Sequence, residues 1–142
     1  PESLEAVYKV VAVNKPDGKL IAVLGSCGGG RDQAKRPILG KLAAQYAEVV
    51  IVTNEDPYDE DPLFIMKAVA DGATAAGKIL DKNLFIIPDR RQGMAAAAKQ
   101  AQANDVVIVT GKGCEQWLMV AGGKIPWDDR QVMSEEIKKI HF

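Results

Sequence analysis

Four short apolar runs, rich in valine and isoleucine, recur along this chain and are separated by longer mixed segments. They occupy residues 20–24, 49–53, 84–87 and 106–110. Each run is apolar at consecutive positions, which is typical of strands covered by helices on both faces of a parallel sheet. A chain of 142 residues has room for one such domain and is too short for two ordinary ones. We therefore expect a single domain over residues 1–142.

Helix-like segments lie between these runs and at both ends of the chain: residues 2–13, 39–46, 62–75, 91–103 and 128–140. Alternation of strand and helix implies right-handed crossovers in an open sheet. The last helix is expected to be capped by Asp128 or Asp129. Within residues 116–127 a Gly-Gly pair predicts a hairpin. The predicted fold class is α/β: a Rossmann-like open, mostly parallel sheet with helices on both faces and one antiparallel edge strand or hairpin near the C-terminus.

The charge composition argues against several classes of partner. There are 18 basic and 19 acidic residues, whereas a nucleic-acid groove or an anionic membrane surface requires clustered lysine and arginine. No apolar stretch is long enough to span a bilayer, and no signal segment opens the chain, so we expect a cytoplasmic location. Cys27 and Cys114 are far apart and the single histidine, His141, is near the end, so no metal site is expected.

Polar segments follow each of the four runs. They read "GSCGGGRDQAKRP", "NEDPYDEDP", "PDRRQG" and "GKGCEQW". In open α/β sheets, ligands bind in the crevice beyond the carboxyl ends of the strands. These four segments are therefore the predicted place of the chemistry.

The first segment has glycines where a phosphate-binding turn would have them. It fits neither G-x-G-x-x-G nor G-x-x-x-x-G-K-[ST], because no Lys-Ser/Thr pair follows. Its specific feature is Arg31, whose planar guanidinium suits a pair of carboxylate or phosphate oxygens. The alternative is that Arg31 is simply solvated at the start of a helix.

The second and fourth segments carry carboxylates. Asp56 lies in the acidic second segment, and Glu115 follows the glycines Gly111 and Gly113, which permit close backbone approach. The acidic segment is either a solvated turn with a helix cap or a receiver for an amine. A guanidinium for a carboxylate and carboxylates for amines together indicate a pocket for an amino acid more than one for a nucleotide.

The stretches "GSCGGGRDQAKRPILGKLA", "VVIVTNEDPYDEDP", "VVIVTGKGCE" and "WDDR" resemble, in order and spacing, the C-terminal domain of the Mur ligases. The similarity covers essentially the whole chain. The branch it resembles, the UDP-N-acetylmuramoyl-tripeptide synthetases, adds the third amino acid to the peptidoglycan precursor. The opening "PESLEAV" is similar to the text just after that family's Asp-Tyr-Ala-His-Thr segment, so we expect the chain to be excised from a longer protein.

This resemblance implies an ATP-dependent, amide-forming ligase of three domains. In such enzymes ATP phosphorylates the terminal carboxylate of UDP-MurNAc-L-Ala-D-Glu, and the amine of the incoming amino acid attacks the acyl phosphate. ATP and magnesium are implied for the central domain and the UDP sugar for the first domain. The present chain is then the third domain, with the amino acid as its ligand, no cofactor or catalytic residue of its own, and no activity alone.

The resemblance also implies roles for five residues. Arg31 matches the arginine that grips the α-carboxylate of the incoming amino acid, and Gly111 and Glu115 match positions that hold the far end of a diamino acid. Asp56 and Tyr58 fall in the specificity motif, Asp-Asn-Pro-Arg in diaminopimelate-adding members and "EDPY" here. Loss of the motif arginine removes a partner for the distal carboxylate of diaminopimelate. We therefore expect a preference for lysine or a similar side chain.

Two points stay open at the level of sequence. Cys114 stands where the family commonly has histidine, which leaves any role of that side chain in doubt. The alternatives to the tripeptide branch are another Mur-type or folylpolyglutamate-synthase-like ligase domain, and a free-standing α/β module that binds a small molecule. The sequence also indicates packing for the two tryptophans of the hairpin region, and capping or solvation for Arg90 and Arg91.

Overall fold

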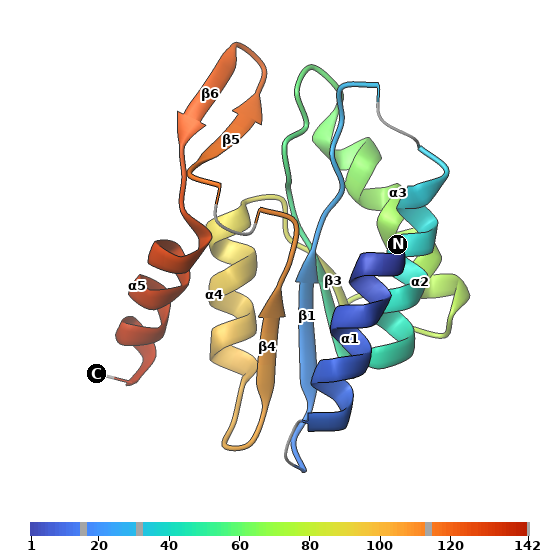
Figure 1. The fold of residues 1–142 in the computed structure, drawn as a ribbon, viewed down its shortest axis with the longest axis vertical. Helices are drawn as coiled ribbons and strands as arrows, with labels where there is room; N and C mark the ends of the chain where they lie inside the picture. Colours follow the sequence, from blue (N-terminus) through green and yellow to red (C-terminus); the bar gives the residue numbers. More distant parts are fainter. Residues whose placement is uncertain (15–16, 31–32, 113–114, 142) are drawn as a thin grey trace.

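A four-stranded parallel sheet forms the centre of the molecule in the computed structural model (Figure 1), which describes residues 1–14, 17–30, 33–112 and 115–141. The strands are β1 (Leu20–Leu24), β2 (Val49–Val52), β3 (Leu84–Ile86) and β4 (Val106–Val109), in the order β3-β2-β1-β4. All three pairings are parallel. The predicted runs therefore form the predicted strands, and the α/β fold class is confirmed.

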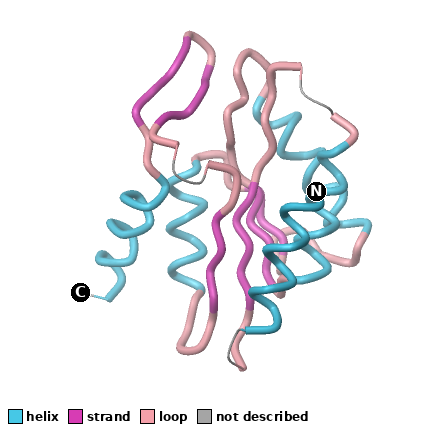
Figure 2. The backbone as a smooth tube through the Cα atoms, in the orientation of Figure 1, coloured by secondary structure: helices cyan, strands magenta, loops and turns pink. Residues whose placement is uncertain are grey.

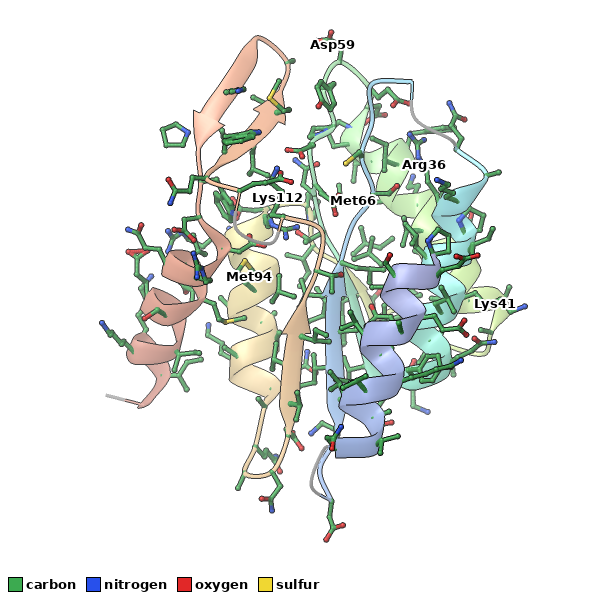
Figure 3. All side chains as sticks on the ribbon, in the orientation of Figure 1. Arg36, Lys41, Asp59, Met66, Met94 and Lys112 are labelled. Carbon is green, nitrogen blue, oxygen red and sulfur yellow. The ribbon has the colours of Figure 1, made fainter. Side chains whose placement is uncertain are left out.

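Two cores, one on each face of the sheet, explain why the strands are apolar at every position. Side chains of β1 alternate between them: Leu20, Ala22 and Leu24 join the core with Met66, whereas Ile21 and Val23 join the core with Met94. Figure 3 labels Met66 and Met94 on helices at opposite sides of the sheet. A strand buried on both faces cannot carry a polar side chain without a partner.

Five helices supply these two layers. Helices α1 (Glu2–Asn14), α2 (Lys35–Tyr46) and α3 (Pro62–Ala75) cover one face, and α4 (Arg90–Gln100) and α5 (Asp129–His141) the other (Figures 1 and 2). Among the residues with described coordinates, no helix is long and apolar enough to cross a membrane.

The helix ends follow local capping chemistry. The Asp61 side chain accepts a hydrogen bond from the Leu63 amide at 3.0 Å, and the Asp89 side chain accepts one from the Gln92 amide at 3.0 Å. Asp128 accepts from the Arg130 amide at 3.0 Å, so of the two proposed caps for the last helix Asp128 is the one used. Helix α2 begins one turn earlier than the predicted segment 39–46, because Pro37 fits the first turn of a helix, where its missing N–H leaves no bond unmade.

The predicted hairpin is present as β5 (Trp117–Val120) and β6 (Gly123–Pro126). It does not extend the parallel sheet, because its two strands pair only with each other in a separate sheet. Instead, Met119 binds the loop after β2: its amide donates to Asp56 Oδ1 at 2.7 Å, and its carbonyl accepts from the Tyr58 amide at 3.1 Å. The hairpin thus stands beyond the carboxyl ends of the strands, above the sheet in Figure 1.

Candidate functional site

The order of the strands places the site. Strand β1 lies between β2 and β4, so the chain leaves β1 toward one side and later returns to its other side. Such a switch point leaves a crevice at the carboxyl ends of the central strands. A cavity of about 480 Å³ lies there, lined by loop residues after β1, β2 and β4 and by the first two turns of α1. This volume is in the range of small-molecule sites.

Glu55 is the carboxylate that faces this cavity. It is 8% exposed, and its Oε2 accepts a hydrogen bond from the Cys27 thiol at 3.1 Å. Burial raises the pKa of Glu55, and the thiol and the nearby cations Arg90 and Lys112 offset this only in part. The sequence placed Glu55 in the acidic segment but not among the five binding residues. The signal in the sequence was the place of Glu55 just after the apolar run 49–53, where ligand-binding residues of open α/β sheets lie.

Gly111 packs against Glu55. Its φ is +110°, and a Cβ at this position would fall inside van der Waals distance of the Glu55 carboxylate. Both the backbone conformation and the space therefore require glycine. The expected close approach to the Gly111 backbone is therefore present in the structure. The group that approaches it is the carboxyl group of Glu55.

Asp56 and Glu115 lie on either side of a buried lysine. The Lys112 ammonium nitrogen is 2.7 Å from Asp56 Oδ2 and 2.7 Å from Glu115 Oε2. The Lys112 side chain is fully buried, that of Asp56 nearly so, and that of Glu115 is 45% exposed. Figure 3 labels Lys112 at the upper end of the sheet, below the hairpin. The two carboxylates that the sequence indicated as receivers for an amine thus already hold an internal one.

Tyr58 occupies the same loop as Asp56 with its ring turned toward the glycine segment. It has a φ of +53°, which is uncommon for a residue other than glycine. Its ring atoms lie about 3 Å from the position that a Cβ on Gly29 would take. The loop after β2 and the loop after β1 are therefore in contact through Tyr58.

Arg90 is buried, so the expectation that it is solvated is wrong, whereas its bonds to two loop carbonyls agree with the alternative that it caps a loop. It is 3% exposed and forms a two-pronged ion pair with Asp129, with Nε–Oδ1 2.9 Å and Nη2–Oδ2 2.7 Å. It also donates to the carbonyls of Asn54 at 3.0 Å and Thr110 at 3.2 Å. Arg90 thereby joins the ends of β2 and β4 to α5. Trp127 donates to the same Asp129 Oδ1 at 2.6 Å.

Arg36 connects the glycine segment to the acidic loop and was not indicated by the sequence. Its side chain is fully buried, and Nη2 donates to the Cys27 carbonyl at 3.3 Å and to both Glu60 oxygens at 3.1 and 3.2 Å. The corresponding signal was the "KRP" at the start of a helix, since an arginine there can reach back over the preceding loop. Arg36 and Arg90 together fix the positions of the loops around the cavity.

The structure brings most of the predicted residues to one end of the sheet. Asp56 and Glu115 meet at Lys112, Gly111 borders the cavity, and Tyr58 is next to the glycine segment. Arg31 and Cys114 lie outside the described residues, so their roles stay predictions.

The parallel sheet, the helices on its two faces and the crevice at the switch point place the chain in the Rossmann-like α/β class. Comparison with known families is more specific: the model of "Mur ligase, glutamate ligase domain" matches residues 1–113. The chain belongs to this family, as the sequence motifs predicted.

Named relatives agree with this assignment. The chain is 42% identical to a UDP-N-acetylmuramoyl-L-alanyl-D-glutamate--2,6-diaminopimelate ligase of Streptomyces coelicolor, over 96% of this chain and 26% of that protein. It is 38% identical to a UDP-N-acetylmuramyl-tripeptide synthetase of Roseiflexus sp., over 91% of this chain and 25% of that protein.

A solved structure of a UDP-N-acetylmuramoyl-L-alanyl-D-glutamate--2,6-diaminopimelate ligase superimposes with a TM-score of 0.88 at 34% sequence identity. The superposition covers all of this chain and 28% of that one. The chain therefore spans about a quarter of the length of the relatives it matches.

Proposed function

We propose that residues 1–142 are the C-terminal, amino-acid-binding domain of an ATP-dependent ligase that adds the third amino acid to UDP-MurNAc-L-Ala-D-Glu in the cytoplasm. The observation that carries this proposal is the match to Mur ligases over nearly the whole chain. The crevice supports it, because a cavity of about 480 Å³ at a switch point suits a small-molecule ligand.

The nucleotide and the UDP sugar are assigned to other parts of the longer protein. The glycine segment here lacks the Lys-Ser/Thr pair that a P-loop uses for phosphate and magnesium. Among the described side chains, no group of three or more potential ligands could hold a metal ion. The described residues therefore do not fit ATP and magnesium, and we expect the isolated domain to be inactive.

The five predicted residues form the proposed amino-acid site. Arg31 would bind the α-carboxylate through its guanidinium. Gly111 borders the cavity, and Glu115 has the exposed carboxylate that an ammonium group can reach. Asp56 and Tyr58 shape the loop that carries the specificity motif of the family.

We further propose that the ligase prefers lysine, or another side chain without a distal carboxylate, over diaminopimelate. The named relatives include diaminopimelate ligases, and by the resemblance those carry arginine in the motif where this chain has Tyr58. The surroundings are also unfavourable for an added carboxylate, because Asp56 and Glu115 together exceed the charge of Lys112 by one.

An amino-acid panel assayed with the full-length ligase tests this proposal. Ligation to UDP-MurNAc-L-Ala-D-Glu is measured with lysine, ornithine and diaminopimelate, first for the natural enzyme and then for Tyr58→Arg. We expect lysine to be the better substrate and Tyr58→Arg to gain use of diaminopimelate. Equal use of both by the natural enzyme would refute the preference, and failure to ligate any of the three would refute the proposed function.

A further inference from the structure

Lys112 is a buried cation held by two carboxylates at the proposed amino-acid site. Both N–O distances are 2.7 Å, and the lysine side chain has no exposed area. A ligand in the crevice therefore cannot reach this ammonium group. Burial lowers the pKa of Lys112, but the hydrogen bonds from its ammonium group to Asp56 and Glu115 outweigh this and leave the pKa raised, so the group stays charged.

The two carboxylates are not equivalent. Asp56 is 7% exposed and both its oxygens are engaged, Oδ2 by Lys112 and Oδ1 by the Met119 amide at 2.7 Å. Glu115 is 45% exposed, and its described side-chain bond uses only Oε2. A substrate ammonium group that binds Asp56 would displace bonds that Asp56 already makes. At Glu115 it can bind Oε1, and the side-chain bond described for Glu115 uses Oε2.

Asp56, Lys112 and Glu115 together carry one unit of negative charge, and this charge lies on the exposed Glu115. Asp56 and Lys112 neutralise each other in the interior, because an unpaired buried charge is costly. Lys112 also restrains Glu115, whose amide donates to the Lys112 carbonyl at 3.0 Å. A carboxylate fixed at both its backbone and its side chain loses little conformational entropy when it binds a ligand.

We propose that Lys112 is a specificity-determining positioning residue, which neutralises Asp56 and holds the Glu115 carboxylate in place to receive the side-chain ammonium group of the incoming amino acid. Asp56, whose two oxygens already accept bonds from Lys112 and Met119, then serves the hairpin and the charge balance. This inference rests on the proposed function and goes beyond it, since it separates the roles of two residues that the sequence treated alike.

The test is a double-mutant cycle in the full-length ligase, with KM and kcat measured for lysine and for norleucine, which lacks the ammonium group. Norleucine is measured as an inhibitor if its turnover is too slow. The cycle uses Lys112→Met, Glu115→Gln and both together, all in an Asp56→Asn background. That background avoids a buried, unpaired Asp56 when Lys112 is removed, and the family motif has asparagine at this position. Thermal melting verifies that each variant folds.

Asp56→Asn is the reference variant of the cycle, and every KM is compared with that of this variant, because loss of the Asp56 charge by itself changes the charge balance around Lys112. In that background, Glu115→Gln and Lys112→Met should each raise the KM for lysine about tenfold, the loss of one charge-assisted hydrogen bond. Together they should raise it little more, and neither should alter norleucine binding or the kcat for lysine. Lys124→Met is the matched control: Lys124 stacks on the Trp117 ring at 4.5 Å, outside the Asp56–Glu115 pair, and should change nothing.

Three results would overturn this assignment. Lys112 would be a structural residue only if Lys112→Met weakened the binding of lysine and of norleucine equally, or if its effect on the KM for lysine added to that of Glu115→Gln. Lysine ligation by the natural enzyme would then still support the proposed function. A natural enzyme that ligates no diamino acid would overturn the function and this assignment together.

Discussion

Arg90 and Asp129 form the most extensively bonded ion pair of the described structure, with Nε–Oδ1 and Nη2–Oδ2 distances of 2.9 and 2.7 Å. Burial raises the pKa of the Asp129 carboxyl, but the bonds from Arg90 outweigh burial and leave that pKa lowered. Because Arg90 also binds the Asn54 and Thr110 carbonyls, the pair determines where the loops after β2 and β4 lie. The floor of the crevice thus depends on a pair contributed by α4 and the start of α5.

Replacing Arg90 by methionine should destabilise the protein by about 3–5 kcal/mol, because Asp129 would remain as a buried, unpaired charge. Urea unfolding measures the change. The neighbouring Arg91 is the control: its side chain is 40% exposed and pairs with the exposed Glu135 and with Glu136. Glu136 is buried but keeps Lys139 as a partner when Arg91 is removed, so Arg91→Ala should have a much smaller effect. Equal losses for the two variants would contradict the role assigned to Arg90.

Gly111→Ala should be more destabilising than Gly122→Ala. Both glycines have positive φ, +110° and +93°, so each substitution carries backbone strain on the order of 1–3 kcal/mol. Only at Gly111 does the new methyl group also meet the Glu55 carboxylate, whereas nothing lies within 4 Å at Gly122. We expect a difference of at least about 1 kcal/mol between the variants, measured by denaturant unfolding; no difference would show that Glu55 moves away freely.

Glu55 should make stability fall as the pH rises. Burial raises the pKa of its carboxyl above the usual 4.5, so the folded protein binds this proton more tightly than the unfolded chain does. The resulting stabilisation is complete below the unfolded pKa and is lost as the pH rises through the folded one. Glu55→Gln should therefore gain stability over the natural chain progressively as the pH rises above about 4.5. A pH-independent difference in the free energy of unfolding would argue against a raised pKa.

Asp105 should show the opposite dependence. It accepts bonds from the Lys19 amide and ammonium, both at 2.8 Å, and from the Gln102 amide at 2.9 Å. These bonds, that of the Lys19 side chain first, lower the pKa of Asp105 to about 2. Its stabilising contribution is present above the usual pKa of 3.8 and is lost as the pH falls through about 2. NMR titration of the carboxyl carbon measures the pKa, and Lys19→Met should raise it; a pKa unchanged in that variant would refute the assignment.

The sequence predicted the sheet well because burial on both faces leaves a local signature. The four runs became β1 to β4, and Pro62–Ala75 became α3 with the predicted bounds, since apolar periodicity and a proline in the first turn act within a few residues. The hairpin was also predicted from its Gly-Gly pair. The contact of the hairpin with the loop after β2 was not predicted. Met119 makes this contact through two hydrogen bonds, and each joins residues about 60 positions apart.

The sequence by itself determined the fold class, the end of the sheet that carries the polar segments, and the family, because all three are encoded in local patterns and motifs. Only the tertiary structure decided how the charges are paired. The sequence indicated Asp56 and Glu115 as receivers for an amine, but Lys112 lies between them. It indicated that Arg90 caps or solvates a loop, but did not indicate its buried ion pair with Asp129. Pairing of charges depends on distances in space, and the strength of each pair depends on burial, so neither follows from the positions of the residues along the chain.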